Sequence, residues 1–258
     1  MTGLTAPFKR TVRPFVGGSY ADGGGLRYLR HPNYAQDGAH YVRSFAIIQK
    51  QLQDLFEYVE PDDVNAATYS FRVMSLLVTT CVEIEASFKA ILTENGYGKS
   101  GNFDMTDYSK IERTHRLSEY RIRIPYWKGA LKERKPFGAW ASPGGRLLWY
   151  QAYNSVKHDR HSSFKLATFE NLTDAVCGLF ALLSSQFHSE DFAPGSIGLS
   201  VGSRNSHPDF DFGIGDFLEI AYPSGWLAEE RYSFDAYKLD FNDPGAVNLI
   251  NYSQVSSV

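Results

Sequence analysis

The chain has 258 residues, long enough to bury a sizeable core in one large domain or in one domain with an elaborated end. Apolar residues make up 43% and charged residues 21% of it, a composition typical of a globular protein and not of a disordered chain. The formal net charge of -3 argues against a broad basic surface, so any contact with nucleic acid would have to be local.

The sequence predicts no targeting signal and no membrane span. Its N-terminus lacks the apolar core of a signal peptide, and no run reaches the roughly 18 uncharged apolar residues that a transmembrane helix needs. We therefore expect a cytoplasmic protein without membrane contact. The two cysteines, Cys81 and Cys177, lie within apolar helical patterns, where a free thiol behaves as a small hydrophobe. A disulfide or zinc site is not expected.

Residues 1–36 predict an irregular N-terminal arm. Pro7, Pro14, Pro32 and several glycines exclude a long regular element. We expect the aromatic residues between them to anchor the arm by packing against the rest of the protein. The arm is also locally basic, which leaves two interpretations open: solvated charges, or contact with an acidic partner.

Two long amphipathic helices are predicted next, from residue 37 to about 60 before Pro61, and from about 63 to 95 before Gly96. Asp37 opens the first of them. In both, apolar residues recur at spacings of three and four, which is typical of a helix with one buried face. At about 30 residues, the second helix would span roughly 45 Å.

Two carboxylates interrupt the apolar middle of the second helix. Glu85 has Lys89 one turn further on, which predicts an ordinary surface pair. Glu83 lies nearer the apolar stripe, and a half-buried carboxylate requires a cation or hydrogen-bond donors. We expect either that Lys157 or His158 supplies them, or that the Glu83 carboxylate reaches water.

Residues 96–145 predict a variable connector, with a short strand at Tyr120–Trp127 where apolar and polar residues alternate. Its glycine-rich start, residues 96–101, follows a helix and lacks the Gly-Lys-Ser/Thr ending that opens a phosphate-binding helix. We interpret this start as a helix stop and a turn. Pro143 and the two glycines after it close the connector.

The helix predicted from Arg146 to beyond His161 carries the clearest functional signal. No glycine or proline interrupts it, and the side opposite its polar face is apolar. At about 100° per residue, the polar face collects Tyr150, Asn154, Lys157, His158 and His161. An ordinary surface helix would carry Glu and Lys instead, so this face is the candidate site.

A last long helix is expected from Phe164 to about His188, because apolar residues step by three and four. Beyond it, strands are predicted at 216–222 and 231–241, and Asp209–Gly213 is interpreted as a turn. The expected fold is mainly α. It consists of an irregular arm (1–36), an up-down bundle of about four helices (37–190) and a small β-containing C-terminal extension (191–258).

The polar face of the central helix is compatible with three roles. In acid–base catalysis, His158 would move protons while Lys157 and Arg160 stabilise negative charge, as metal-free RNA cleavage requires. In ligand binding, Asn154 and His158 would contact polar edges while Lys157 neutralises a phosphate. In a structural role, the same side chains would be hydrogen-bonded at a helix or subunit contact. His158 and His161 could chelate a metal, but no nearby carboxylate completes the ligand set, so neither a metal site nor a cofactor is predicted.

Three segments together resemble HEPN-type bacterial four-helix domains over about residues 40–188. They are a long helix with Cys81-Val82-Glu83-Ile84-Glu85 before Lys89, a helix with Tyr153-Asn154-Ser155-Val156-Lys157-His158-Asp159-Arg160, and a final apolar helix rich in Ala and Leu. The resemblance implies a helical bundle. Active members of that superfamily are metal-independent ribonucleases, often toxins or phage-defence effectors, with an Arg-x4-6-His signature at a dimer interface.

This sequence departs from that signature, because Gln151 and Ala152 stand where the arginine belongs. The resemblance therefore implies a non-catalytic or degenerate member: a binding or scaffold protein in a defence or toxin-antitoxin system, expected to be a homodimer. Its partner would be RNA, a nucleotide or another protein. One alternative is a ribonuclease that uses His158, Lys157, Asn154 and Arg160, with Glu83, Tyr150, His161 and Arg72 as accompanying binding residues. The other is a purely structural helical domain.

Overall fold

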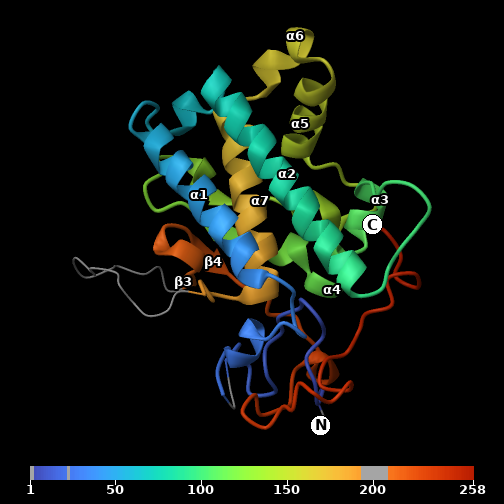
Figure 1. Ribbon diagram of the computed structural model, residues 1–258. Coiled ribbons are helices and arrows are strands. Elements are labelled where there is room, and N and C mark those ends of the chain that lie inside the picture. The colour runs from blue at the N-terminus through green and yellow to red at the C-terminus, as the bar shows by residue number, and fades with distance from the viewer. Residues whose placement is uncertain (1–2, 22–23, 193–208) are drawn as a thin grey trace.

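Helix α7 (Phe169–Phe187) forms the centre of the molecule, and nearly all of its side chains are buried. Helices α1 (Gly38–Phe56), α2 (Phe71–Glu94) and α5 (Leu148–His158) pack against it, as Figure 1 shows for this computed structural model, which describes residues 3–21, 24–192 and 209–258. Their apolar stripes meet in one core, to which the arm and the extension also contribute side chains. The prediction of a mainly α fold is confirmed.

Both cysteines are buried free thiols, as expected from their apolar surroundings, with Cys81 in α2 and Cys177 in α7. Burial raises the pKa of the Cys177 thiol to about 12, which keeps it protonated and inert at neutral pH. Among the residues described, no helix is both long and apolar enough to cross a bilayer.

Helix α2 starts later than predicted. The Ser70 hydroxyl accepts a hydrogen bond from the backbone N–H of Val73 (3.2 Å) and caps the helix there, which leaves 24 residues in it. Upstream, only a short 3-10 turn forms at Asp63–Asn65. The Asp63 carboxylate accepts hydrogen bonds from the indole of Trp127 (2.8 Å) and from two backbone amides of the connector. Asp63 therefore anchors the connector, and the predicted start near this residue was wrong.

The predicted continuous helix after residue 146 is interrupted at Asp159. The backbone there is not helical (φ -140°, ψ 76°), and the Asp159 carboxylate accepts a hydrogen bond from the N–H of Ser162 (3.2 Å). This bond caps a new short helix, α6 (Arg160–Ser163), because an aspartate can satisfy nearby backbone donors that a continuing helix would use. A 3-10 turn (Phe164–Leu166) then leads to Thr168, which caps α7. The prediction of one helix through His161 was wrong, whereas the last long helix is confirmed as α7 but starts at Phe169, five residues later than predicted.

A small antiparallel sheet with strand order β2-β1-β4-β3 lies beside α7. Strands β1 (Arg121–Arg123) and β2 (Glu133–Arg134) come from the connector, whereas β3 (Asp211–Phe212) and β4 (Glu219–Ala221) come from the extension. The strands predicted around β1 and β4 are confirmed, although both are shorter than expected. Strand β3 forms where we predicted a turn, because its backbone pairs with β4. The extension thus contributes half of the sheet.

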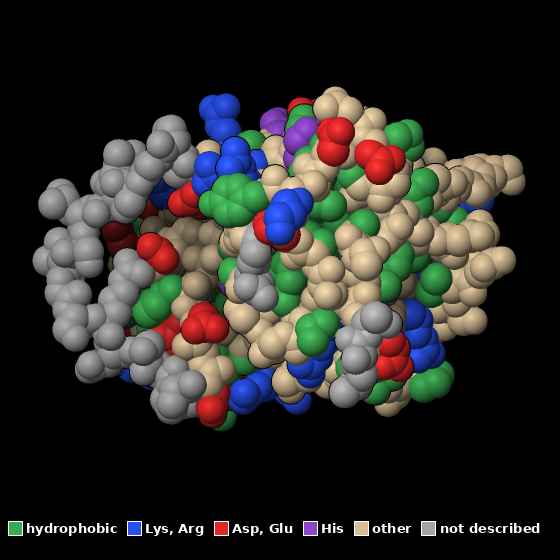
Figure 2. Space-filling view, turned by 90° about the horizontal axis from the view of Figure 1, so that it is seen from below, with side chains coloured by type: hydrophobic (Ala, Val, Ile, Leu, Met, Phe, Trp, Pro, Cys, Tyr) green, Lys and Arg blue, Asp and Glu red, His purple; other side chains and the backbone are tan. Residues whose placement is uncertain are grey.

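The N-terminal arm and much of the C-terminal extension after β4 lie side by side at one end of the helices (Figure 1). Tyr232 forms parallel bridges with Leu4 and Phe15, and the strand predicted over residues 231–241 does not form. Figure 2 views this end, where acidic and basic side chains are interspersed over the described residues. The boundaries at 36 and 190 remain predictions, and residues 193–208 of the extension lie outside the described residues.

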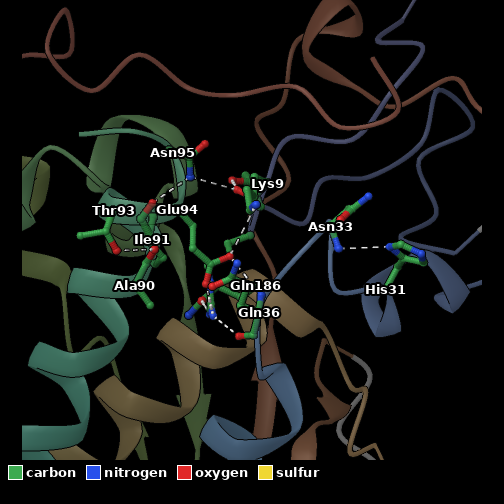
Figure 3. A network of polar contacts seen from close by, with 12 residues as sticks. Lys9, His31, Asn33, Gln36, Ala90, Ile91, Thr93, Glu94, Asn95 and Gln186 are labelled. Atoms are coloured by element: carbon green, nitrogen blue, oxygen red, sulfur yellow. Dashed lines mark hydrogen bonds and ion pairs between the residues drawn. The ribbon is translucent and has the colours of Figure 1, made fainter. Parts of the chain in front are cut away.

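Arg10 joins the arm to helices α2 and α7. Its side chain is fully buried; Nε donates to Glu94 Oε1 (2.7 Å), Nη1 to Gln186 Oε1 (2.9 Å) and Nη2 to the carbonyl of Gln36 (2.6 Å). Figure 3 shows these three acceptor residues converging from α2, α7 and the arm. We expected the arm's basic residues to be solvated or to face an acidic partner, but Arg10 is an internal residue paired with an internal carboxylate.

The imidazole of His115, in α4 (Glu112–His115), is fully buried beside this network. Its Nε2 lies 2.9 Å from the carbonyl oxygen of Arg10, and its Nδ1 lies 2.8 Å from Thr114 Oγ1. Burial lowers the pKa of His115 to about 4, compared with about 6.5 in an unfolded chain. The unfolded chain therefore binds more protons between these values, and stability is lost as the pH falls from 6.5 towards 4.

We expect His115 to account for a loss of about 2 kcal/mol in unfolding free energy between pH 7 and pH 5. Urea unfolding of the wild type and of His115→Gln at both pH values measures this loss. The glutamine amide can still donate to the Arg10 carbonyl but does not titrate, so the variant should lose about 2 kcal/mol less over this range. His40→Gln, at an exposed histidine, is the control. An equal loss in His115→Gln and the wild type would contradict the prediction.

Candidate functional site

A groove with a volume of about 920 Å³ lies between α2 and α5, and we call it the α2–α5 groove. Helix α3 (Met105–Ser109) and the loop before it close one end. The side chains that give the groove its chemistry are Glu85, Lys89, Tyr97, Lys99, Tyr108, Tyr150, Asn154 and Lys157. Its volume is within the range of small-molecule sites, so the groove can hold a ligand of nucleotide size.

Tyr150 and Glu85 link the two helices at this groove. The Tyr150 hydroxyl donates to Glu85 Oε1 at 2.8 Å, and the tyrosine side chain is almost completely buried. Burial and this bond to a carboxylate raise the pKa of Tyr150 well above its usual value. Burial, with Glu85 nearby, raises the pKa of Tyr108 to about 12. Both phenols therefore stay protonated at neutral pH, and the Tyr150 hydroxyl donates its proton to Glu85.

The lysines of the groove are of two kinds. Lys99 is paired: its ammonium lies 3.0 Å from Asp104 Oδ2 and also contacts Asp107. The Lys157 ammonium lies over the ring of Tyr153, 5.0 Å from its centroid, and contact with Tyr153 together with the charge of Glu85 raises the pKa of Lys157. Among the described residues, no carboxylate lies within 4.0 Å of the ammonium of Lys157 or of Lys89.

The glycine-rich start of the connector forms a turn after α2, as predicted, and its Tyr97 and Lys99 line the groove. The Tyr97 hydroxyl donates to Asp107 Oδ1 (2.7 Å), and the Asp107 carboxylate also accepts from the backbone N–H of Asp104 (2.9 Å). The bond from Asp104 belongs to a capping box that starts α3, in which the Asp104 carboxylate in turn accepts from the backbone N–H of Asp107. The loop is therefore held in place and its aromatic side chain is positioned at the groove.

Three of the predicted site residues line this groove: Tyr150, Asn154 and Lys157. Tyr150 was expected on the exposed polar face, yet it is buried, because its ring packs beside Trp149 and Tyr153 while only its hydroxyl reaches Glu85. Leu148 lies on the side of the helix opposite the predicted polar face, which we expected to be packed, yet it is 77% exposed. The two faces of α5 are thus rotated slightly from those predicted.

The other predicted residues lie elsewhere. His158 is exposed at the last residue of α5, and Arg160 and His161 follow the break at Asp159 on α6. Arg72 is exposed in the first turn of α2. His158 therefore belongs to α5 and Arg160 and His161 to α6, so the three side chains do not lie on one continuous helix.

Glu83 does not bond to Lys157 or His158. It lies two positions before Glu85, which places the two carboxylates on nearly opposite sides of α2, and Glu85 is the one that faces α5. Burial raises the pKa of Tyr41 on α1, and the charges of Arg10, Glu94 and Glu83 act on the same phenol. Glu83 therefore lies towards α1. The predicted pairing was wrong, as was the predicted surface pair of Glu85 with Lys89.

His158→Ala should change the unfolding free energy by less than about 0.5 kcal/mol. The side chain is exposed, and it makes no hydrogen bond or ion pair with any described residue. Urea unfolding at pH 7 measures this. If His158→Ala lowered the unfolding free energy by more than about 1 kcal/mol, the prediction would be contradicted. Such a loss would favour the structural role of the polar face.

The groove offers positive charges and the side-chain amide of Asn154, whereas the hydroxyls of Tyr97 and Tyr150 already donate to Asp107 and Glu85. No histidine is among the side chains that line it. Among the described residues, no three of His, Cys, Asp and Glu converge as a possible metal site. This arrangement suits binding of a polar, anionic ligand better than acid–base chemistry.

The sequence pattern missed Glu85, Lys89 and the loop residues Tyr97 and Lys99 as groove residues. The available signal was the i, i+4 spacing of Glu85 and Lys89 on the side of α2 that meets α5, but which helix covers this side depends on the tertiary packing.

Comparisons of the chain with protein-family models, with curated proteins and with solved structures found no match.

Proposed function

We propose that this chain is a HEPN-like bacterial protein of binding type, and that the α2–α5 groove binds a nucleotide. The proposal takes α1, α2, α5 and α7 as an up-and-down four-helix bundle of the HEPN kind. It is supported by their order in the chain and by their mutual packing around α7. A cytoplasmic location, a homodimer and a role in defence or toxin-antitoxin biology belong to the same proposal and rest on the resemblance alone.

The observation that carries the nucleotide proposal is the pair of lysines without carboxylate partners. Lys89 and Lys157 line one groove from two helices, and a bound phosphate would supply the direct ion-pair partner that no described carboxylate provides within 4.0 Å. The rings of Tyr97 and Phe103 line the same groove and offer surfaces for a base. Asn154 adds an amide that can donate to and accept from polar edges.

A binding function without catalysis is supported by the position of His158. Its imidazole lies outside the groove lining, and Arg160 belongs to the next helix, α6. A metal-independent ribonuclease needs a proton-transferring group and a cation at the same phosphate. The groove residues supply cations but no imidazole.

Titration calorimetry with ATP and, separately, with inorganic triphosphate tests the proposal. We expect ATP to bind, and Lys89→Gln and Lys157→Gln each to weaken it by about tenfold, the loss expected for one charge-assisted contact. Lys50→Gln, at an exposed lysine of α1, is the matched control and should bind like the wild type.

Two results would overturn parts of the proposal. If inorganic triphosphate binds as tightly as ATP, the groove recognises only an anion and no base. If the wild type cleaves labelled RNA in EDTA and a folded His158→Ala variant does not, the protein is a ribonuclease. Absence of ATP binding at millimolar concentration would refute nucleotide binding altogether.

A further inference from the structure

A second surface lies at the end of the helices opposite the arm and the extension (Figure 1). There the start of α2 meets the 3-10 turn that follows α6, and Phe71 (65% exposed), Tyr69 (51%) and Leu166 (40%) face solvent. The half-buried ring of Phe164 connects them, with its centroid 4.7 Å from that of Phe71 and 5.5 Å from that of Tyr69. We call these four residues the aromatic tip.

The backbone holds the aromatic tip in place. Tyr69 forms an antiparallel bridge with Thr168, and the side-chain amide of Asn171 donates to the carbonyl of Leu166 (2.9 Å). Ser70, between the two exposed aromatic residues, caps α2. The rings are therefore preorganised, so the binding of a ligand that stacks on them costs little free energy for ordering the backbone.

Basic side chains surround the tip. Arg72 follows Phe71, Lys165 follows Phe164, and Arg160 lies in the preceding helix α6; all three are exposed, and none makes an ion pair within 4.0 Å with a described residue. Within residues 69–72 and 158–166 the only carboxylate is Asp159, which is occupied as the cap of α6. In a chain with a net charge of -3, this is a local positive surface.

We propose that the aromatic tip binds single-stranded nucleic acid, with unpaired bases stacked on Phe71 and Tyr69 and with phosphates contacted by the surrounding cations. Exposed aromatic rings beside cations are the combination that binds single strands without sequence preference. Paired bases are already stacked on each other and do not offer their faces. The inference does not depend on nucleotide binding in the α2–α5 groove.

Other occupants fit this surface less well. In a symmetric dimer through the tip, the same patch would face itself, so the three cations of one copy would meet those of the other. Insertion into a membrane requires a broader apolar face than three partly exposed side chains provide. A single strand satisfies both the rings and the charges.

Fluorescence anisotropy with labelled oligo-dT and oligo-rU of about 12 nucleotides tests the proposal, and the two oligonucleotides distinguish DNA from RNA. We expect binding that weakens as salt rises from about 50 to 200 mM. Phe71→Ala and Phe71→Leu should each weaken it by about tenfold, because leucine keeps the apolar contact but cannot stack as a ring does. Arg72→Gln should lower the slope of log affinity against log salt by about 0.7.

Matched controls locate the site. Tyr58→Ala removes an aromatic side chain that is 84% exposed outside the tip, and it should bind like the wild type, as should Lys50→Gln at an exposed lysine of α1. The proposal fails if neither oligonucleotide binds, or if Phe71→Leu binds like the wild type. It also fails if only anionic vesicles of phosphatidylcholine and phosphatidylserine bind, and bind through Phe71, which would identify a membrane-binding surface.

Discussion

Glu94→Ala should destabilise the protein by about 3–5 kcal/mol, because it removes one partner of a buried ion pair and leaves the other uncompensated. The guanidinium of Arg10 is fully buried, and Glu94 is the carboxylate that neutralises it. The same carboxylate accepts a hydrogen bond from the backbone N–H of Gln36 (3.0 Å), so its loss also loosens the end of the arm. Urea unfolding at pH 7, followed by circular dichroism, measures the change.

A double replacement separates loss of the pair from loss of packing. Arg10→Met with Glu94→Leu removes both charges and should recover a substantial part of the stability, since no buried charge then remains unpaired. Glu60→Ala is the matched control: it breaks the pair with Lys128, whose side chains are more than half exposed, and should have little effect. If Glu94→Ala and Glu60→Ala lowered the unfolding free energy by the same small amount, the prediction would be wrong, and Arg10 would not depend on its ion pair with Glu94.

Trp127→Ala should also cost about 3–5 kcal/mol, by removing a large buried side chain and leaving a cavity. The indole is 2% exposed and stacks on Phe169 at the start of α7, with ring centroids 5.2 Å apart. The guanidinium of Arg134 lies over the same ring, 4.4 Å from its centroid. The alanine variant therefore loses both the stacking of the connector on α7 and the contact with the Arg134 guanidinium.

Trp127→Phe distinguishes packing from hydrogen bonding. It keeps a ring against Phe169 but cannot donate to Asp63, so we expect a smaller loss than for alanine. Tyr58→Ala, at a tyrosine that is 84% exposed, should change stability by no more than about 0.5 kcal/mol. If Trp127→Ala and Tyr58→Ala gave similar unfolding midpoints, Trp127 would not belong to the core.

Local sequence signals were most reliable where one physical rule dominated. The apolar spacing that predicted the first two helices corresponds to their buried faces, because burial of a stripe such as Val73, Leu77 and Ile84 stabilises a helix wherever its partner lies. The ends of helices were less predictable. Ser70 and Asp159 are both good caps, but whether such a residue ends or continues a helix depends on which backbone donors the fold leaves without partners.

The candidate site illustrates the same limit at the level of side chains. The sequence placed Tyr150, Asn154 and Lys157 on one helix face, and all three line the groove. It could not predict that Glu85, and not Glu83, would face them, because the two carboxylates differ only in which neighbouring helix covers their side of α2. Likewise, it treated Arg10 as a surface charge of the arm, whereas Glu94, far away in the chain, makes its burial possible.

The sequence by itself determined the mainly α class, the approximate positions of the long helices and the burial of both cysteines, since these follow from periodicity and composition within short windows. Only the tertiary structure decided the break at Asp159 and the pairing of Tyr150 with Glu85. It also decided the separation of His158 from the groove lining. These features depend on contacts between segments distant in the chain, and the free energy of such contacts is set by packing and desolvation, which no local pattern encodes.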